Sequence, residues 1–147
     1  MTNEKIEIEI NTKDKPPKWI WEEAHRVFEL DDTDTIYTYG NVIHDTRTAK
    51  YELAPSVIAH EIEHMKQQAR TEGGPDAWWR KYFDDPEFRK WQEIEAYRVQ
   101  YAHACQIYKD RNDQARYLNI IAGFASSPMY KINLTKSEAL QLIRNRK

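Results

Sequence analysis

Five consecutive residues, His60-Glu61-Ile62-Glu63-His64, place a carboxylate between two imidazoles in an HExxH pattern. On a helix, the two histidines lie one turn apart on the same face, and both can reach a single metal ion. Glu61 then lies beside that ion, where its carboxylate can take a proton from water and pass it to a leaving amine. The pattern therefore predicts a zinc site at His60 and His64, with Glu61 as general base.

The residues around this motif predict that it lies on a helix. Pro55 can start a helix, because its missing N–H costs little in the first turn. The apolar residues that follow recur at helical spacing and leave both histidines on another face; they are Val57, Ile58, Ile62 and Met65. A solvated face of polar residues is the alternative interpretation, and the clean amphipathic pattern favours the metal site.

A zinc site with an open position needs a third protein ligand. No histidine follows His64 until His103, so a carboxylate further along the chain is the better candidate. Two are available, Glu93 and Glu95, on a helix that we predict over residues 86–109. The helix begins with Asp85 as its N-cap and a proline in its first turn.

Helical phase separates these two glutamates. Glu93 falls among polar side chains, whereas Glu95 is surrounded by apolar ones; these are Phe88, Trp91, Val99 and Ala102. A carboxylate on an apolar face needs a neutralising partner, and a metal cation is one. We therefore predict Glu95 as the third ligand. The alternatives are Glu93, or an ion pair from Glu95 to Arg98 or to another arginine.

The HExxH motif and the downstream Glu-Ala pair resemble the gluzincin branch of zinc metallopeptidases. More narrowly, four segments are similar to small phage and prophage HExxH proteins, namely residues 59–68, 77–80, 85–88 and 92–98, within a resemblance that covers about residues 35–143. The resemblance implies a minimal zincin-like fold, zinc held by His60, His64 and Glu95, and Glu61 as general base. Many gluzincins carry an aspartate four residues after the ligand glutamate, where this chain has Val99. Partners that orient the ligand histidines must then come from elsewhere.

The rest of the pattern predicts one α+β domain over residues 1–147. We expect a small N-terminal antiparallel or mixed sheet, the active-site helix and a mainly helical C-terminal half. The expected strands cover residues 5–10, 35–39, 42–46 and 49–53. The other expected helices cover 17–30, a short segment with Trp78 and Trp79, 112–125, and a last segment after a capping box at Thr135 and Glu138.

Several other side chains could take part, although each also has a plain structural explanation. The possible oxyanion donors are Tyr97, Tyr101 and His103. Possible cleft residues are His44, Trp78 and Trp79, of which the tryptophans also fit an aromatic core. Gln67 and Gln68 follow the motif on its face and could bind the ligand histidines or face water.

Composition narrows the class of protein. The chain has 147 residues with 22 Lys and Arg against 24 Asp and Glu, a net charge of -2 that argues against a strongly basic nucleic-acid binder. No apolar run approaches the ~18 residues of a membrane span, and the first residues lack the apolar segment of a secretion signal. The single cysteine fits a reducing compartment. We expect a cytoplasmic protein, in the host cytoplasm if the gene is a phage's.

These observations predict a zinc-dependent hydrolase, specifically a metallopeptidase that acts on a protein or peptide substrate. Neither nucleic acid nor membrane is expected as a partner. The alternative is a non-catalytic metal-binding or protein-interaction domain that retains the zincin fold. The presence of Glu61 favours catalysis, because a purely structural site does not need that carboxylate.

Overall fold

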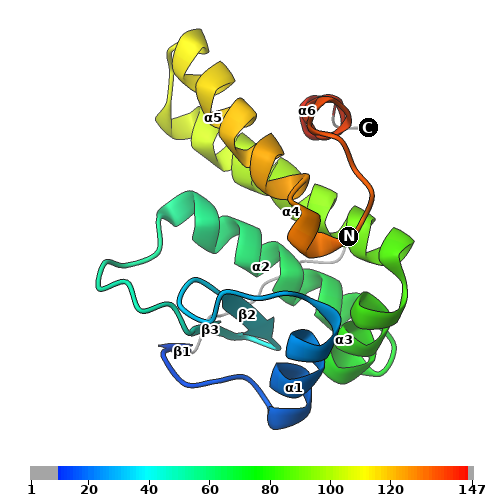
Figure 1. Cartoon of the computed structure of the whole chain (residues 1–147). Helices are drawn as coiled ribbons and strands as arrows, with labels where there is room; N and C mark the ends of the chain where they lie inside the picture. The colour runs from blue at the N-terminus through cyan, green and yellow to red at the C-terminus, as the bar shows by residue number, and fades with distance from the viewer. Residues whose placement is uncertain (1–9, 146–147) are drawn as a thin grey trace.

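Six α-helices and a small sheet make up residues 10–145, the part of the chain that the computed structural model describes (Figure 1). The chain is therefore α+β. The strands are β1 (Ile10–Thr12), β2 (Ile36–Tyr39) and β3 (Val42–Asp45). The helices are α1 (Lys18–Val27), α2 (Pro55–Arg70), α3 (Gly74–Asp84), α4 (Pro86–Ile107), α5 (Arg111–Ala125) and α6 (Lys136–Arg144), with a short 3₁₀ helix, η1, over Pro128–Tyr130. Within residues 10–145, none of the helices is both long and apolar enough to cross a membrane.

The sheet has the strand order β1-β3-β2. Strands β2 and β3 form the predicted antiparallel hairpin, and Gly40 in its turn has a φ of 61° that favours glycine. β1 runs parallel to β3, with Ile10 opposite Val42. Of the strand predicted over 5–10, only Ile10 lies within the described residues.

The strand predicted over residues 49–53 is wrong, since that segment has no strand structure. A side chain reaches carbonyl groups of this region instead. The Lys13 ammonium donates to the carbonyls of Arg47 and Ala49. The segment has no β-branched residue and a single aromatic one, Tyr51, so its intrinsic preference for a strand is weak.

Helix α2 crosses the middle of the molecule, between the sheet and α4 (Figure 1). Its Met65 packs with Ile43 and Leu53 in an apolar cluster on the sheet side. His60 and His64 are also buried, but their side chains face α4. Both sides of α2 are therefore occupied, one by apolar packing and the other by the HExxH histidines.

Helix α4 begins where the sequence predicts. The Asp85 carboxylate accepts hydrogen bonds from the backbone N–H groups of Glu87 and Phe88, which caps the helix. α4 then packs against α5 and α6, and Ile94, Ile121 and Ile143 meet in one core. The capping box predicted at the start of α6 is also present.

A second core joins α1, β2 and α3, and it is largely aromatic. Trp78 and Trp79 of α3 are 1% and 7% exposed, and their rings pack edge to face. Tyr37 and Phe28 lie in the same cluster. Trp78 also lies beside the His64 ring, with ring centroids 5.4 Å apart. The aromatic core therefore forms one wall of the region around the HExxH motif.

Candidate metal centre

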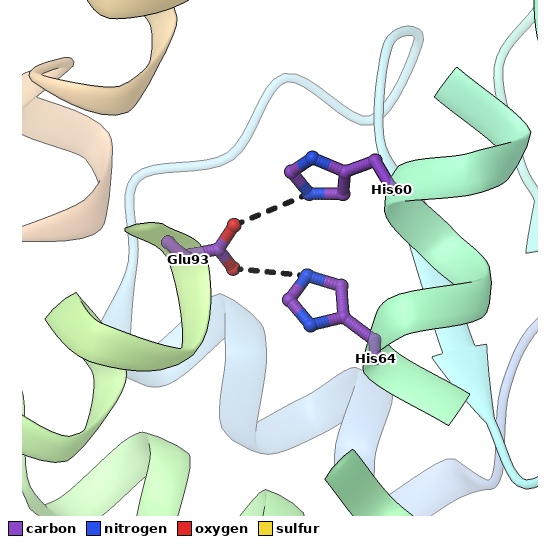
Figure 2. Close-up of side chains that lie close together, drawn as sticks. All are labelled: His60, His64 and Glu93. Atoms are coloured by element: carbon purple, nitrogen blue, oxygen red, sulfur yellow. Dashed lines mark ion pairs between the residues drawn. The ribbon is translucent and has the colours of Figure 1, made fainter. Parts of the chain in front are cut away.

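Three side chains from two helices converge between α2 and α4 (Figure 2). His60 and His64 lie one turn apart on α2, and Glu93 reaches them from α4. His60 Nε2 lies 3.4 Å from Glu93 Oε1, and His64 Nε2 lies 3.4 Å from Glu93 Oε2. All three side chains are buried, at 6%, 6% and 3% exposure.

The structure brings Glu93 to the histidines, not the predicted Glu95. Glu95 is exposed, and its carboxylate lies at the rim of the helix pair, 3.4 Å from Gln67 Nε2. We therefore correct the third member of the site from Glu95 to Glu93.

The physical reason lies in the polarity of the buried α4 face. The side of α4 that is buried here carries Arg89, Glu93 and Gln100, because polar groups surround the site. Trp91, which seemed to mark the buried side, is 37% exposed. The four apolar residues used for the prediction, which are Phe88, Trp91, Val99 and Ala102, therefore lie on a side of α4 that is at most partly buried.

Two glutamine side chains hold the histidines from behind. Gln100 Oε1 lies 2.9 Å from His60 Nδ1, and Gln67 Oε1 lies 2.8 Å from His64 Nδ1. The Gln67 amide donates to the backbone carbonyl of Gln92, which can only accept. This fixes the Gln67 oxygen toward His64, so His64 Nδ1 carries the hydrogen. The two amides are therefore the groups that orient the ligand histidines, a role that Val99 cannot fill. The Nε2 atoms of both histidines are left facing Glu93.

The two histidines and Glu93 face one another in a way that favours a proton or a metal ion between them. A lone pair on His64 Nε2 and a carboxylate oxygen repel each other unless a proton or a metal ion lies between them. Burial disfavours the charged imidazolium, but the Glu93 carboxylate outweighs burial and raises the pKa of His64 to about 9. Burial also opposes the Glu93 anion, and the neighbouring His64 and His60 outweigh it, so the pKa of Glu93 stays well below its usual range.

The residues fit a zinc ion on three counts. The donor set of two imidazole nitrogens and one carboxylate oxygen is that of many catalytic zinc sites. Zinc–ligand bonds of about 2.0–2.1 Å place neighbouring ligand atoms of a tetrahedron about 3.3–3.4 Å apart, and the two nitrogen–oxygen distances here are 3.4 Å. Finally, Glu93 Oε1 is buried without any hydrogen-bond partner, which costs free energy unless a cation binds it.

The other oxygen of Glu93 is held by α3. The Tyr82 hydroxyl donates to Glu93 Oε2 at 2.5 Å. Burial raises the pKa of Tyr82, and the Glu93 carboxylate raises it further, so this hydroxyl remains a donor. The carboxylate is therefore oriented by one neutral donor and keeps its second oxygen free.

Glu61 lies beside His60 at the edge of the cluster. It is 8% exposed, and its Oε2 lies 3.9 Å from His60 Nε2. The Thr38 hydroxyl of β2 donates to Glu61 Oε1 at 2.7 Å and so fixes the carboxylate against the sheet. One Glu61 oxygen is thus held, and the other faces the histidines.

A pocket of about 100 Å³ opens beside these residues. It is lined by His60, Glu61, His64 and Glu93, together with aromatic residues of the second core that include Trp78, Trp79 and Tyr82. Both tryptophans thus belong to the core and also form a wall of the pocket.

The other side chains that the sequence suggested differ in how close they lie to the pocket. Tyr97 lies beside His60, with ring centroids 4.5 Å apart, and its hydroxyl is 2.9 Å from that of Tyr130, which lines the pocket. His103 pairs with Ser56, and His44 with the Asp14 carbonyl, both away from the pocket. Tyr101 packs against the α4–α5–α6 core.

Sequence reasoning missed Thr38, Tyr82 and Gln100 as members of this site. For Gln100 a signal was present: it follows Glu93 by seven residues and therefore shares its helical face. Thr38 and Tyr82 carry no such signal, because each reaches the site only through the packing of another element.

No protein-family model matches this chain, and no curated protein or solved structure matches it either. The chemistry of the site therefore rests on its own geometry.

Proposed function

We propose that this chain is a zinc-dependent hydrolase of zincin-like fold that cleaves amide bonds in a protein or peptide substrate. The observation that carries the proposal is the convergence of His60, His64 and Glu93 on one point, with Glu93 Oε1 lacking a hydrogen-bond partner and the Glu61 carboxylate alongside. A structural zinc site is closed by four protein ligands, whereas three ligands leave a position for water or substrate.

Each residue has a distinct part in this proposal. His60, His64 and Glu93 would hold the ion, and the amides of Gln100 and Gln67 keep the imidazoles in the required tautomer. The ion supplies a Lewis acid and lowers the pKa of water toward neutrality.

Glu61 then takes the proton that the water loses and delivers it to the leaving nitrogen. Thr38 acts on Glu61 alone: its hydrogen bond keeps the carboxylate from rotating away from the histidines.

A non-catalytic metal-binding domain is the second candidate, and the size of the pocket favours it. A volume of about 100 Å³ leaves room for little besides an ion, a water molecule and one small group. A domain in which the metal ion only stabilises the fold would also have a small pocket. Hydrolysis is nevertheless the better proposal, because Glu61 would be a costly buried carboxylate without a catalytic use.

The experiment compares zinc-loaded wild type with Glu61→Gln on a library that contains both extended peptides and short amides. Glu61→Gln is expected to retain zinc and to lose about 10²–10⁴-fold in turnover, the usual contribution of a general base. Glu63→Gln is the matched control, since it makes the same change two residues along α2, on another side of the helix and outside the metal cluster. It should keep both zinc and turnover.

Two results would contradict the proposal. If the wild type binds zinc but hydrolyses nothing in the library, the non-catalytic candidate replaces the hydrolase. If Glu61→Gln and Glu63→Gln lose turnover equally, Glu61 has no special part in the reaction.

A further inference from the structure

The outer edge of β2 is already occupied by side chains. β2 is an edge strand of the described sheet, because it pairs with β3 alone. The Thr38 carbonyl on its free side accepts hydrogen bonds from Gln68 Nε2 at 2.7 Å and from Trp79 Nε1 at 2.9 Å. The next outward group, the Gly40 N–H, donates to Gln68 Oε1 at 2.7 Å.

These hydrogen bonds oppose the pairing of an added peptide with β2 at Thr38 and Gly40. A peptide that extends a sheet binds through the free N–H and C=O groups of the edge strand. Gln68 is 0% exposed and Trp79 is 7% exposed, so both side chains belong to the packed interior and not to a mobile surface. A peptide that paired with β2 at Thr38 would have to displace a buried amide and a buried indole.

The pocket offers a different approach to the metal centre. Of the described residues that line it, four are partly exposed and the others are buried. The four mark its mouth and are Leu30, Ile36, Met129 and Tyr130. The mouth is therefore apolar, and the charged lining residues Glu61 and Glu93 lie at the buried end.

The volume limits what can pass through this mouth. Pockets for drug-sized ligands are about 300–1,000 Å³, compared with about 100 Å³ here. An ion and a water molecule take part of that space. A pocket of this size favours a small group over a stretch of extended backbone.

We propose that the substrate enters end-on through this mouth and presents a small, uncharged acyl amide to the metal centre. The proposal rests on the proposed hydrolysis and narrows its substrate to the acylated end of a chain or a short free amide, both of which share this chemistry. The proposal disfavours internal bonds of an extended polypeptide, because the Thr38 carbonyl and the Gly40 N–H of β2 are already hydrogen-bonded to buried side chains.

Binding of hydroxamic acids to the Co²⁺-loaded protein tests this proposal without requiring turnover. Hydroxamates bind the metal directly, and the visible absorption of Co²⁺ reports their binding. The series consists of acetohydroxamic acid and the same group carrying one, two or three peptide units. We expect acetohydroxamic acid to bind and each added unit to change Kd by less than about threefold, because the Thr38 carbonyl and the Gly40 N–H of β2 already have partners. A gain of about tenfold or more for the longest compound would overturn the proposal, as would failure of acetohydroxamic acid to bind the loaded protein.

A pair of variants tests the position of the mouth. Met129→Trp narrows the mouth and is expected to weaken acetohydroxamic acid binding by about tenfold or more, with Co²⁺ affinity unchanged. Phe124→Trp makes a similar change at a site that is 59% exposed and outside the pocket, and should alter neither. Unchanged hydroxamate binding in Met129→Trp would refute the assigned mouth.

The two proposals fail separately. A protein that binds the hydroxamates as expected but hydrolyses nothing would refute the proposed hydrolysis alone. A protein with Glu61-dependent turnover of internal peptide bonds would refute only the end-on substrate. Within the expected substrates, an acylated peptide and a short free amide compared side by side would show which of the two is preferred.

Discussion

The two buried sides of α4 differ in chemistry although they belong to one helix. Toward α5 and α6, Ile94 is 0% exposed and packs with Ile121 and Ile143. Toward α2, Glu93 and Gln100 are 3% and 5% exposed and face the HExxH histidines. The two sides of α4 are therefore similarly buried, although one is apolar and the other is polar.

The two sides of α4 contribute to the stability of the fold in different ways. Burial of apolar surface stabilises the fold without a partner of any particular kind. Buried carboxylate and imidazole groups cost free energy unless they are paired, and the unpartnered Glu93 oxygen shows that the pairing within the protein is incomplete. We therefore expect the apolar side to stabilise the fold equally with and without metal, and the polar side to stabilise it more when a metal ion is bound.

The largest expected effect is on the apolar side. Ile94→Ala removes a fully buried side chain and should lower the free energy of unfolding by about 2–5 kcal/mol. Urea denaturation of metal-free and zinc-saturated protein measures this loss, which should be the same in both. A loss confined to the zinc-saturated protein would contradict this independence, because it would show that Ile94 stabilises the metal centre.

On the polar side, Glu93→Gln should reduce zinc affinity by more than about 100-fold, the upper end of what partners outside the ligand set contribute. Glu95→Gln is the matched control, two residues away on the exposed side of α4, and should change zinc affinity little. Competition with a chromogenic chelator measures both. Equal losses in the two variants would contradict the correction from Glu95 to Glu93.

Removal of zinc should have an intermediate effect on stability. Zinc at about 100 times its Kd should raise the free energy of unfolding by about 2.7 kcal/mol, because it binds the folded protein preferentially. Thermal or urea unfolding with zinc and with excess chelator gives the difference. Ile94→Ala should retain this increment and Glu93→Gln should lose it. If chelation leaves the unfolding curve unchanged after the metal is shown to be gone, the metal does not tie α2 to α4.

The smallest expected effect is on zinc affinity, at a residue of the polar side that orients a ligand histidine. Gln100→Ala removes the amide oxygen behind His60 and should weaken zinc binding by about 10–100-fold, as is usual for groups that orient a ligand. Gln106→Ala, at an exposed position of the same helix, is the control. A Gln100→Ala variant with unaltered zinc affinity would show that His60 needs no such support.

Much of the secondary structure follows from local chemistry. The β2–β3 hairpin, the start of α2 at Pro55, the Asp85 cap of α4 and the capping box of α6 all involve residues close together in the chain. Such signals can be read from sequence because the interacting groups are only a few positions apart. The failed strand over residues 49–53 had no such local anchor.

The choice between Glu93 and Glu95 could not be made in this way. Helical phase shows that the two lie on different sides of α4, but not which side meets α2. Apolar residues usually mark the buried side, and here the decisive buried side is polar because it surrounds the candidate metal centre. Thr38, which holds Glu61, is likewise 23 positions away in sequence.

The sequence alone determined that His60, Glu61 and His64 share one helical region, because an i, i+4 spacing is a property of the helix itself. Only the tertiary structure decided which carboxylate joins them, what holds Glu61 and how small the adjoining pocket is. Those features depend on how α4, β2 and α3 pack around α2. Packing direction is set by the sum of many weak contacts across the whole molecule, so no short segment of the chain contains it.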